Sequence, residues 1–124
     1  MTTHDDICNR ILKVDSSIRY VGLANKMGTR AEDQYRKGLH PLLKEAELDL
    51  SALESTLRMN LRYDMQYILG KPIYSFTLYE KVKRVTIPLY DNNYQILMMS
   101  FDLEGSHEFI VLEKVLALLG RRQI

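Results

Sequence analysis

The residues best suited to hold a metal lie near the start of the 124-residue sequence, where His4, Asp5, Asp6 and Cys8 occur close together. Imidazole, carboxylate and thiolate groups are all metal ligands, so this run is a candidate site. In the first turn of a terminal helix, however, such residues more often serve as a solvated cap and, for the thiol, as a small buried side chain. We therefore predict no metal and no cofactor here.

Catalysis needs a nucleophile, acid or base held in matched geometry. The sequence contains no phosphate-binding loop, no serine elbow, and no paired cysteines or histidines at ligand spacing. His40 and His107 each occur alone beside a predicted helix, which favours capping or contact with solvent. The sequence thus predicts a protein that is not an enzyme.

A second candidate is a basic surface with an aromatic platform, of the kind that binds RNA. Lys81, Lys83 and Arg84 follow Tyr79, and Arg121 and Arg122 occur later. The alternative is a solvent face kept soluble by charge. Because 17 basic and 16 acidic residues leave a net charge of +1, we favour the solvent face and expect no nucleic-acid partner.

The composition is that of one folded domain covering residues 1–124, with 46% hydrophobic and 27% charged residues. The first residues lack the pattern of a signal peptide, and no stretch approaches about 18 uninterrupted apolar residues. The lone Cys8 fits a reducing compartment. We expect a cytoplasmic protein without a membrane span.

Periodicity and turn signals predict the elements that position any site. The first half should form a helix over about 4–14, a strand over 18–24 and an exposed edge strand over 29–37. Gly38 to Pro41 should form a connection. The second half should form a long helix over 42–69, ended by Gly70, and three strands over 73–79, 82–90 and 94–101. A closing helix should span about 109–119.

The long helix carries two apolar faces. One is a stripe that advances by three or four residues and that we assign to the core: Leu50, Leu53, Leu57, Leu61, Met65 and Ile68 or Leu69. The other is a flank of Met59, Tyr63 and Tyr67, which could be either a packed core or an interface. Between the last two predicted strands, Asp91-Asn92-Asn93 resembles half of a calcium-binding loop. A hairpin turn explains these residues, so we predict no calcium site there.

This order, α-β-β-α-β-β-β-α, predicts an α+β fold with an antiparallel sheet of about five strands. It resembles the roadblock (dynein light chain) family, which belongs with profilin-like folds. Two patches, Ile18 to Gly28 and Lys71 to Phe76, also resemble small uncharacterised archaeal roadblock-like proteins. The polar stretch Ala31 to Arg36 departs from the more apolar second strand of that family.

The resemblance implies a non-catalytic interaction module. Roadblock proteins commonly form homodimers in which the long helix and the following strand meet their symmetry copies. Several act as scaffolds or as regulators of small GTPases. Carried over to this chain, the resemblance makes the following residues the expected interface: Leu57, Met59, Leu61, Tyr63, Tyr67, Tyr74 and Phe76. A small GTPase or another protein is the further partner it implies.

The alternative is a profilin-like or PAS-like sensory domain. It would bind a small apolar molecule between the sheet and the long helix, in a cavity lined by Tyr20, Phe76 and Met98. Bulky residues at most inward positions favour a filled core instead.

Overall fold

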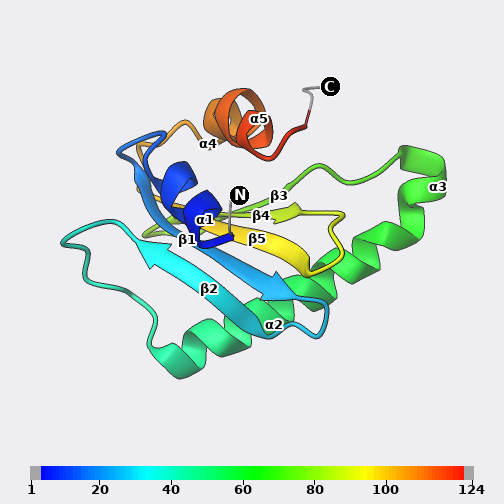
Figure 1. Ribbon diagram of the computed structural model, residues 1–124, viewed down its shortest axis with the longest axis horizontal. Helices are drawn as coiled ribbons and strands as arrows, with labels where there is room; N and C mark the ends of the chain where they lie inside the picture. The colour runs from blue at the N-terminus through cyan, green and yellow to red at the C-terminus, as the bar shows by residue number, and fades with distance from the viewer. Residues whose placement is uncertain (1–3, 122–124) are drawn as a thin grey trace.

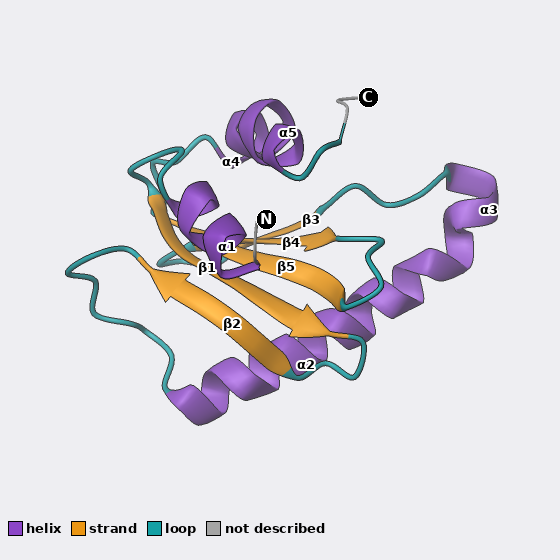
Figure 2. Ribbon diagram, viewed as in Figure 1, coloured by secondary structure: helices purple, strands orange, loops and turns teal. Residues whose placement is uncertain are grey.

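The computed structural model describes residues 4–121, and for residues 4–6 only the backbone. A five-stranded antiparallel sheet has helices on both faces (Figure 1, Figure 2). The strands are β1 (Ile18–Asn25), β2 (Arg30–Tyr35), β3 (Ser75–Leu78), β4 (Lys83–Pro88) and β5 (Tyr94–Phe101). Their order across the sheet is β2-β1-β5-β4-β3, so β2 and β3 form the two edges.

The helices form the outer layers of the fold. They are α1 (His4–Leu12), α2 (Glu45–Arg62), a 3-10 turn η1 (Tyr63–Met65), α3 (Gln66–Leu69), α4 (His107–Phe109), the π-helix η2 (Ile110–Val115) and α5 (Leu116–Leu118). The last three form one continuous closing helix. In Figure 1, α1 and the closing helix lie over one face of the sheet, and α2 crosses the other.

The predicted fold class, element order and antiparallel sheet are confirmed, including the polar edge strand. Several predicted bounds are wrong. The long helix begins at Glu45 because the backbone N–H of Lys44 donates to the Glu47 carboxylate at 2.8 Å, which caps the first turn. Strands β3 and β4 are shorter than predicted. His4, Asp5 and Asp6, the candidate ligands for which we predicted no metal, have side chains outside the described part of the structure.

Local side chains close two of the hairpins, β1–β2 and β4–β5. The Asn25 side chain accepts the backbone N–H groups of Met27 and Thr29 at 2.9 and 3.0 Å, and Gly28 has a φ of +79°. A Cβ on Gly28 would lie 3.1 Å from the Cα of Leu53 in α2, so the β1–β2 turn rests directly on that helix. The predicted turn after β4 is confirmed, because the Asp91 carboxylate accepts the Tyr94 N–H at 3.1 Å.

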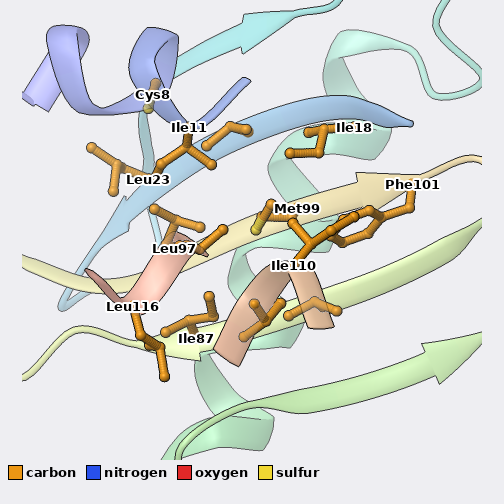
Figure 3. Packing of buried hydrophobic residues seen from close by; sticks show 14 residues of the cluster. Cys8, Ile11, Ile18, Leu23, Ile87, Leu97, Met99, Phe101, Ile110 and Leu116 are labelled. Atoms are coloured by element: carbon orange, nitrogen blue, oxygen red, sulfur yellow. The ribbon is translucent and has the colours of Figure 1, made fainter. Parts of the chain in front are cut away.

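The larger core lies between the sheet and the helices α1, η2 and α5 (Figure 3). Phe101 of β5 is fully buried here, beside Ile18 of β1 and Ile110 of the closing helix. Cys8 of α1 is buried in the same layer, as predicted for a small apolar side chain. This layer holds the two ends of the chain onto one face of the sheet.

The smaller core lies beneath α2 and overturns the prediction for that helix. Leu48, Ala52 and Met59 of α2 pack on the sheet. They meet four strand residues: Tyr20, Ala24, Ile96 and Met98. The leucine stripe assigned to the core faces solvent instead. Small residues such as Ala52 and Thr56 let the helix backbone approach the sheet closely, which leucines would prevent.

An arginine on the edge strand β2 ties the start of α2 to the sheet. Arg30 donates to Glu45 at 2.8 Å and to Asp49 at 3.0 Å, both on α2, and to Asp33 of its own strand at 2.8 Å. Hydrogen bonding to Glu45 is the largest cause that raises the pKa of the Arg30 guanidinium. The charged residues of β2 therefore help to hold the start of α2 against the sheet.

Candidate interaction surface

The two edges of the sheet differ in chemistry. Edge strand β2 carries Arg30, Glu32 and Asp33, and charged residues prevent an edge from pairing with other strands. Edge strand β3 has the sequence Ser-Phe-Thr-Leu, without a charged residue or proline. Leu78 and the adjacent Tyr79 are exposed. The β3 edge is therefore the one open to an additional strand.

The outward face of α2 carries an exposed apolar stripe that continues into η1 with Met65. Its residues are between 42% and 70% exposed, and we name them the α2 stripe: Leu50, Leu53, Leu57, Leu61 and Met65. Tyr67, Ile68 and Leu69 extend the exposed apolar surface into α3. Contiguous exposed apolar surface of this kind is typical of a protein–protein interface.

Three of the predicted interface residues on the helices are exposed: Leu57, Leu61 and Tyr67. Met59 is only 1% exposed, because it lies two residues from Leu57 and so on nearly the opposite side of the helix. Tyr63 is half-buried and has its ring 6.0 Å from that of Tyr90. Met59 and Tyr63 thus support α2 from within.

Two predicted interface residues precede or lie in β3. Tyr74 is half-buried and packs on the larger core. Phe76 pairs with Val85 of β4, whose side chain belongs to the same core, so Phe76 lies on the sheet face opposite α2. Its ring stacks on His107 at a centroid distance of 3.8 Å. Phe76 and the α2 stripe therefore lie on different faces of the sheet.

His107, stacked on Phe76, makes stability depend on pH. Its Nδ1 is buried and has no hydrogen-bond partner among the described residues, and burial, followed by the nearby Lys83 charge, lowers the pKa of the imidazole. The folded state therefore binds fewer protons than the unfolded state below about pH 6.5. We expect the free energy of unfolding to fall as the pH drops through this range, and to fall less steeply in His107→Gln.

Urea unfolding followed by circular dichroism between about pH 7 and 5 measures this dependence. Asp102 also makes the free energy of unfolding fall as the pH drops, but at lower pH than His107. The reason is that hydrogen bonding to Arg36 lowers the pKa of the Asp102 carboxyl group. Parallel pH profiles for the wild type and His107→Gln would contradict the prediction.

A narrow polar groove separates α2 from β3 and β4. It is lined by Ser55, Arg58, Met59 and Arg62 from α2, Ser75 and Thr77 from β3, Tyr79, and Arg84 and Thr86 from β4. Among the described residues, neither Arg58 nor Arg62 forms an ion pair. The groove thus places positive charge between the α2 stripe and the β3 edge.

The other sites considered from the sequence are arranged differently. Lys83 and Arg84 are neighbours in a strand and point to opposite faces: Lys83 donates to the Gly105 carbonyl, and Arg84 donates to Ser51 of α2. Among the side chains that the structure describes, those of residues 7–121, no three potential metal ligands form a group. No helix in that part of the chain is long and apolar enough to cross a membrane.

The cavity of the alternative interpretation, lined by Tyr20, Phe76 and Met98, is not formed among the described residues, because Met98 is buried beneath α2 and Phe76 lies on the other face. A hollow of about 480 Å³ does exist at the start of α2, and Tyr20 is the one residue of the three among those lining it.

The sheet order and the placement of the helices define a class: the chain has the roadblock fold. The Roadblock/LC7 domain from Streptomyces avermitilis superimposes with a TM-score of 0.71 at 10% identity, over 94% of this chain and 91% of that one. The gliding protein MglB from Thermus thermophilus gives 0.68 at 14% identity, over 92% and 85%.

A third structure, MglB in a tetrameric arrangement, gives a TM-score of 0.66 at 14% identity, over 93% of this chain and 86% of that one. At these identities the likeness establishes the fold alone. It does not support the predicted resemblance to archaeal proteins. No protein-family model matches the sequence, and no curated protein matches it.

The sequence analysis identified the residues of the α2 stripe but assigned the stripe to the core, and it named only Leu57 and Leu61 of these residues as interface positions. It did not identify Leu78 and Tyr79 as exposed neighbours. One signal could have separated the two faces. Leu48, Ala52, Thr56 and Met59 also recur at helical spacing, and they include the small residues that a closely packed helix needs.

Proposed function

We propose that this chain is a non-catalytic, cytoplasmic protein-interaction module that works as a homodimer. The α2 stripe and the β3 edge form its contact surface, in the manner that the roadblock resemblance implies. The observation that carries the proposal is the exposure of five apolar side chains along one face of α2. Burying such a face supplies the main driving force of association.

The two parts of the surface fit a two-fold symmetric contact. An isologous dimer uses the same patch on both subunits, and a neutral edge strand can pair antiparallel with its own copy. Pairing of β3 with a second β3 would place the two α2 helices next to each other on one face of the joined sheet. The hydrogen-bonding groups of the β3 edge and the leucines of α2 would then be covered together.

Charges along α2 favour an antiparallel arrangement of the two helices. Glu54 and Arg62 lie four residues on either side of Arg58. An antiparallel pair centred near Arg58 would therefore bring each Glu54 opposite the other subunit's Arg62. Such ion pairs define the register of the two helices more than they increase the affinity of the dimer.

We extend the proposal to a further partner, a small GTPase or another protein, as the resemblance implies for a module without chemistry of its own. The tetrameric arrangement of MglB, a protein of the same fold, supports assembly through protein contacts. The α3 surface of Tyr67, Ile68 and Leu69 is the exposed region that we assign to this second contact.

The test of the dimer is the solution mass of Leu57→Glu/Leu61→Glu. We expect the wild type to have the mass of two chains by light scattering, and the double variant to have the mass of one. The variant should keep the wild-type circular dichroism spectrum, because both side chains already face solvent in the protomer.

The matched control places the same two charges on exposed apolar residues away from α2, one in the loop after β5 and one on the closing helix, in Leu103→Glu/Phe109→Glu. It should remain dimeric. A wild type that is monomeric at about 50 µM, well above the dissociation constant of a specific dimer, would contradict the proposal, and so would a dimer that survives both charges on α2.

A further inference from the structure

A hollow of about 480 Å³ opens on the α2 face of the sheet, beyond the first turn of that helix. Its lining comes from several parts of the chain: Arg19 and Tyr20 of β1, Tyr35 of β2, Leu39 and Pro41 to Leu43 of the connection, Leu48 of α2, Tyr79 to Val82 of the β3–β4 turn, Arg84 of β4 and Ser100 of β5. Its size falls within the range of small-molecule sites.

The floor of the hollow is one row of residues running across the sheet. Arg84 pairs with Ser100, Ser100 with Tyr20, and Tyr20 with Tyr35. Ser100 is the small residue in this row, so the floor is lowest between the guanidinium and the tyrosine rings. The helix α2 covers the neighbouring row at Met98. In this row it contacts Tyr20 and Arg84, and Ser100 between them remains partly exposed.

Gly22 helps to keep the hollow open. A Cβ at this position would overlap the Tyr20 ring, so the absence of a side chain lets that ring lie along its own strand. The Tyr20 hydroxyl then donates to the Asp33 carboxylate at 3.1 Å, and its ring packs against Tyr35 at a centroid distance of 4.9 Å. The tyrosine is therefore held away from the space above Ser100.

The walls of the hollow are mostly apolar. Leu39, Leu42 and Leu43 form one side, and Tyr79 and Val82 of the β3–β4 turn form the other. A molecule with an apolar body would bury its surface between them, with a gain of roughly 25 cal/mol for each Å² removed from water.

Three positive charges line the hollow, and they differ in their surroundings. Arg19 is compensated by Asp102 at 3.1 Å, and Lys81 is exposed to solvent in the β3–β4 turn. Arg84 is half-buried and donates to the Ser51 hydroxyl, but it forms no ion pair with any of the side chains described for residues 7–121. A guanidinium has five N–H donors, so it retains donors for an anionic group.

From this combination we propose that the hollow binds a small organic monoanion with an apolar body, such as a carboxylate with an aliphatic chain. Arg84 binds the anionic head, and the leucine and tyrosine walls hold the body. This site lies on the sheet floor rather than on the α2 stripe, and it shares only Tyr79 with the β3 edge, so binding of the anion by Arg84 does not require the proposed dimer.

The experiment is a titration of the ¹⁵N-labelled full chain with decanoate, followed by amide chemical shifts, with decanol as the neutral probe of equal chain length. We expect saturable shifts at Tyr35, Leu43 and Ser100, and decanoate to bind about tenfold or more tightly than decanol. A hydrogen-bonded charge is worth that much discrimination.

Two variants separate the head from the body of the ligand. Arg84→Gln should weaken decanoate binding about tenfold and leave decanol binding unchanged. Ser100→Leu should fill the floor and remove binding of both probes. The control is Arg10→Gln, which removes an exposed arginine on α1, on the opposite side of the sheet from the hollow. This variant should bind both probes as the wild type does.

Three results would overturn the proposal. These are equal affinities for decanoate and decanol, shifts confined to Leu50 to Met65 of the α2 stripe, and no saturation below the concentration at which decanoate forms micelles. If Ser100→Leu fails to fold, the comparison of the two probes on Arg84→Gln still decides the outcome.

Discussion

Phe101→Ala should lower the free energy of unfolding by about 3–5 kcal/mol, the range for deleting a buried aromatic ring. Phe101 ends the central strand β5 and is fully buried. Its ring packs in the layer that joins the sheet to α1 and the closing helix, beside Ile18 and Ile110 (Figure 3). The structure around such a ring relaxes only in part, so most of its volume would remain as a cavity.

The matched control is Phe109→Ala, which deletes the same atoms from a side chain that is 57% exposed on the closing helix. It should cost less than about 1 kcal/mol. Urea unfolding of both variants at one protein concentration measures the difference. Equal losses would mean that Phe101 does not lie in the core.

Met59→Ala should lower the free energy of unfolding by about 2–5 kcal/mol, because Met59 is the largest fully buried side chain of α2. It packs in the smaller core with Ile96 and Met98. The other buried side chains of α2 are short apart from Leu48, so loss of Met59 would leave the second half of the helix held chiefly by Tyr63.

The control for this prediction is Met27→Ala, the same change at a methionine that is 82% exposed in the β1–β2 turn. It should change stability by less than about 0.5 kcal/mol. Met59 was also a predicted interface residue, and the two roles differ in readout. A core role lowers stability and leaves the solution mass unchanged, whereas an interface role would lower the mass of the assembly without destabilising the protomer.

Chain-local signals account for the parts of the fold that were predicted correctly. Asn25 and Gly28 close one hairpin and Asp91 another, each through the conformations and hydrogen bonds that its own type favours. Alternating polar residues over Arg30–Tyr35 predicted the edge strand. These features depend on neighbours within a few residues, which a sequence displays directly.

The candidate sites depend on contacts between distant segments, and here the sequence was a weaker guide. The floor of the hollow brings Arg84, Ser100, Tyr20 and Tyr35 into one row through the pairing of four strands. Phe76 faces away from α2 because its register with Val85 places it on the other face. Register across a sheet is set by strand pairing, so neither arrangement follows from spacing along the chain.

The sequence by itself determined that this protein has an α+β fold, which elements it contains, and that α2 has two apolar faces. Only the tertiary structure decided which of these faces is buried. Hydrophobicity favours burying Leu57 and Leu61. The helix nevertheless lies so close to the sheet that small side chains such as Ala52 and Thr56 fill the space between them. Close packing of α2 on the sheet selected the face with smaller side chains, and the leucines were left outside.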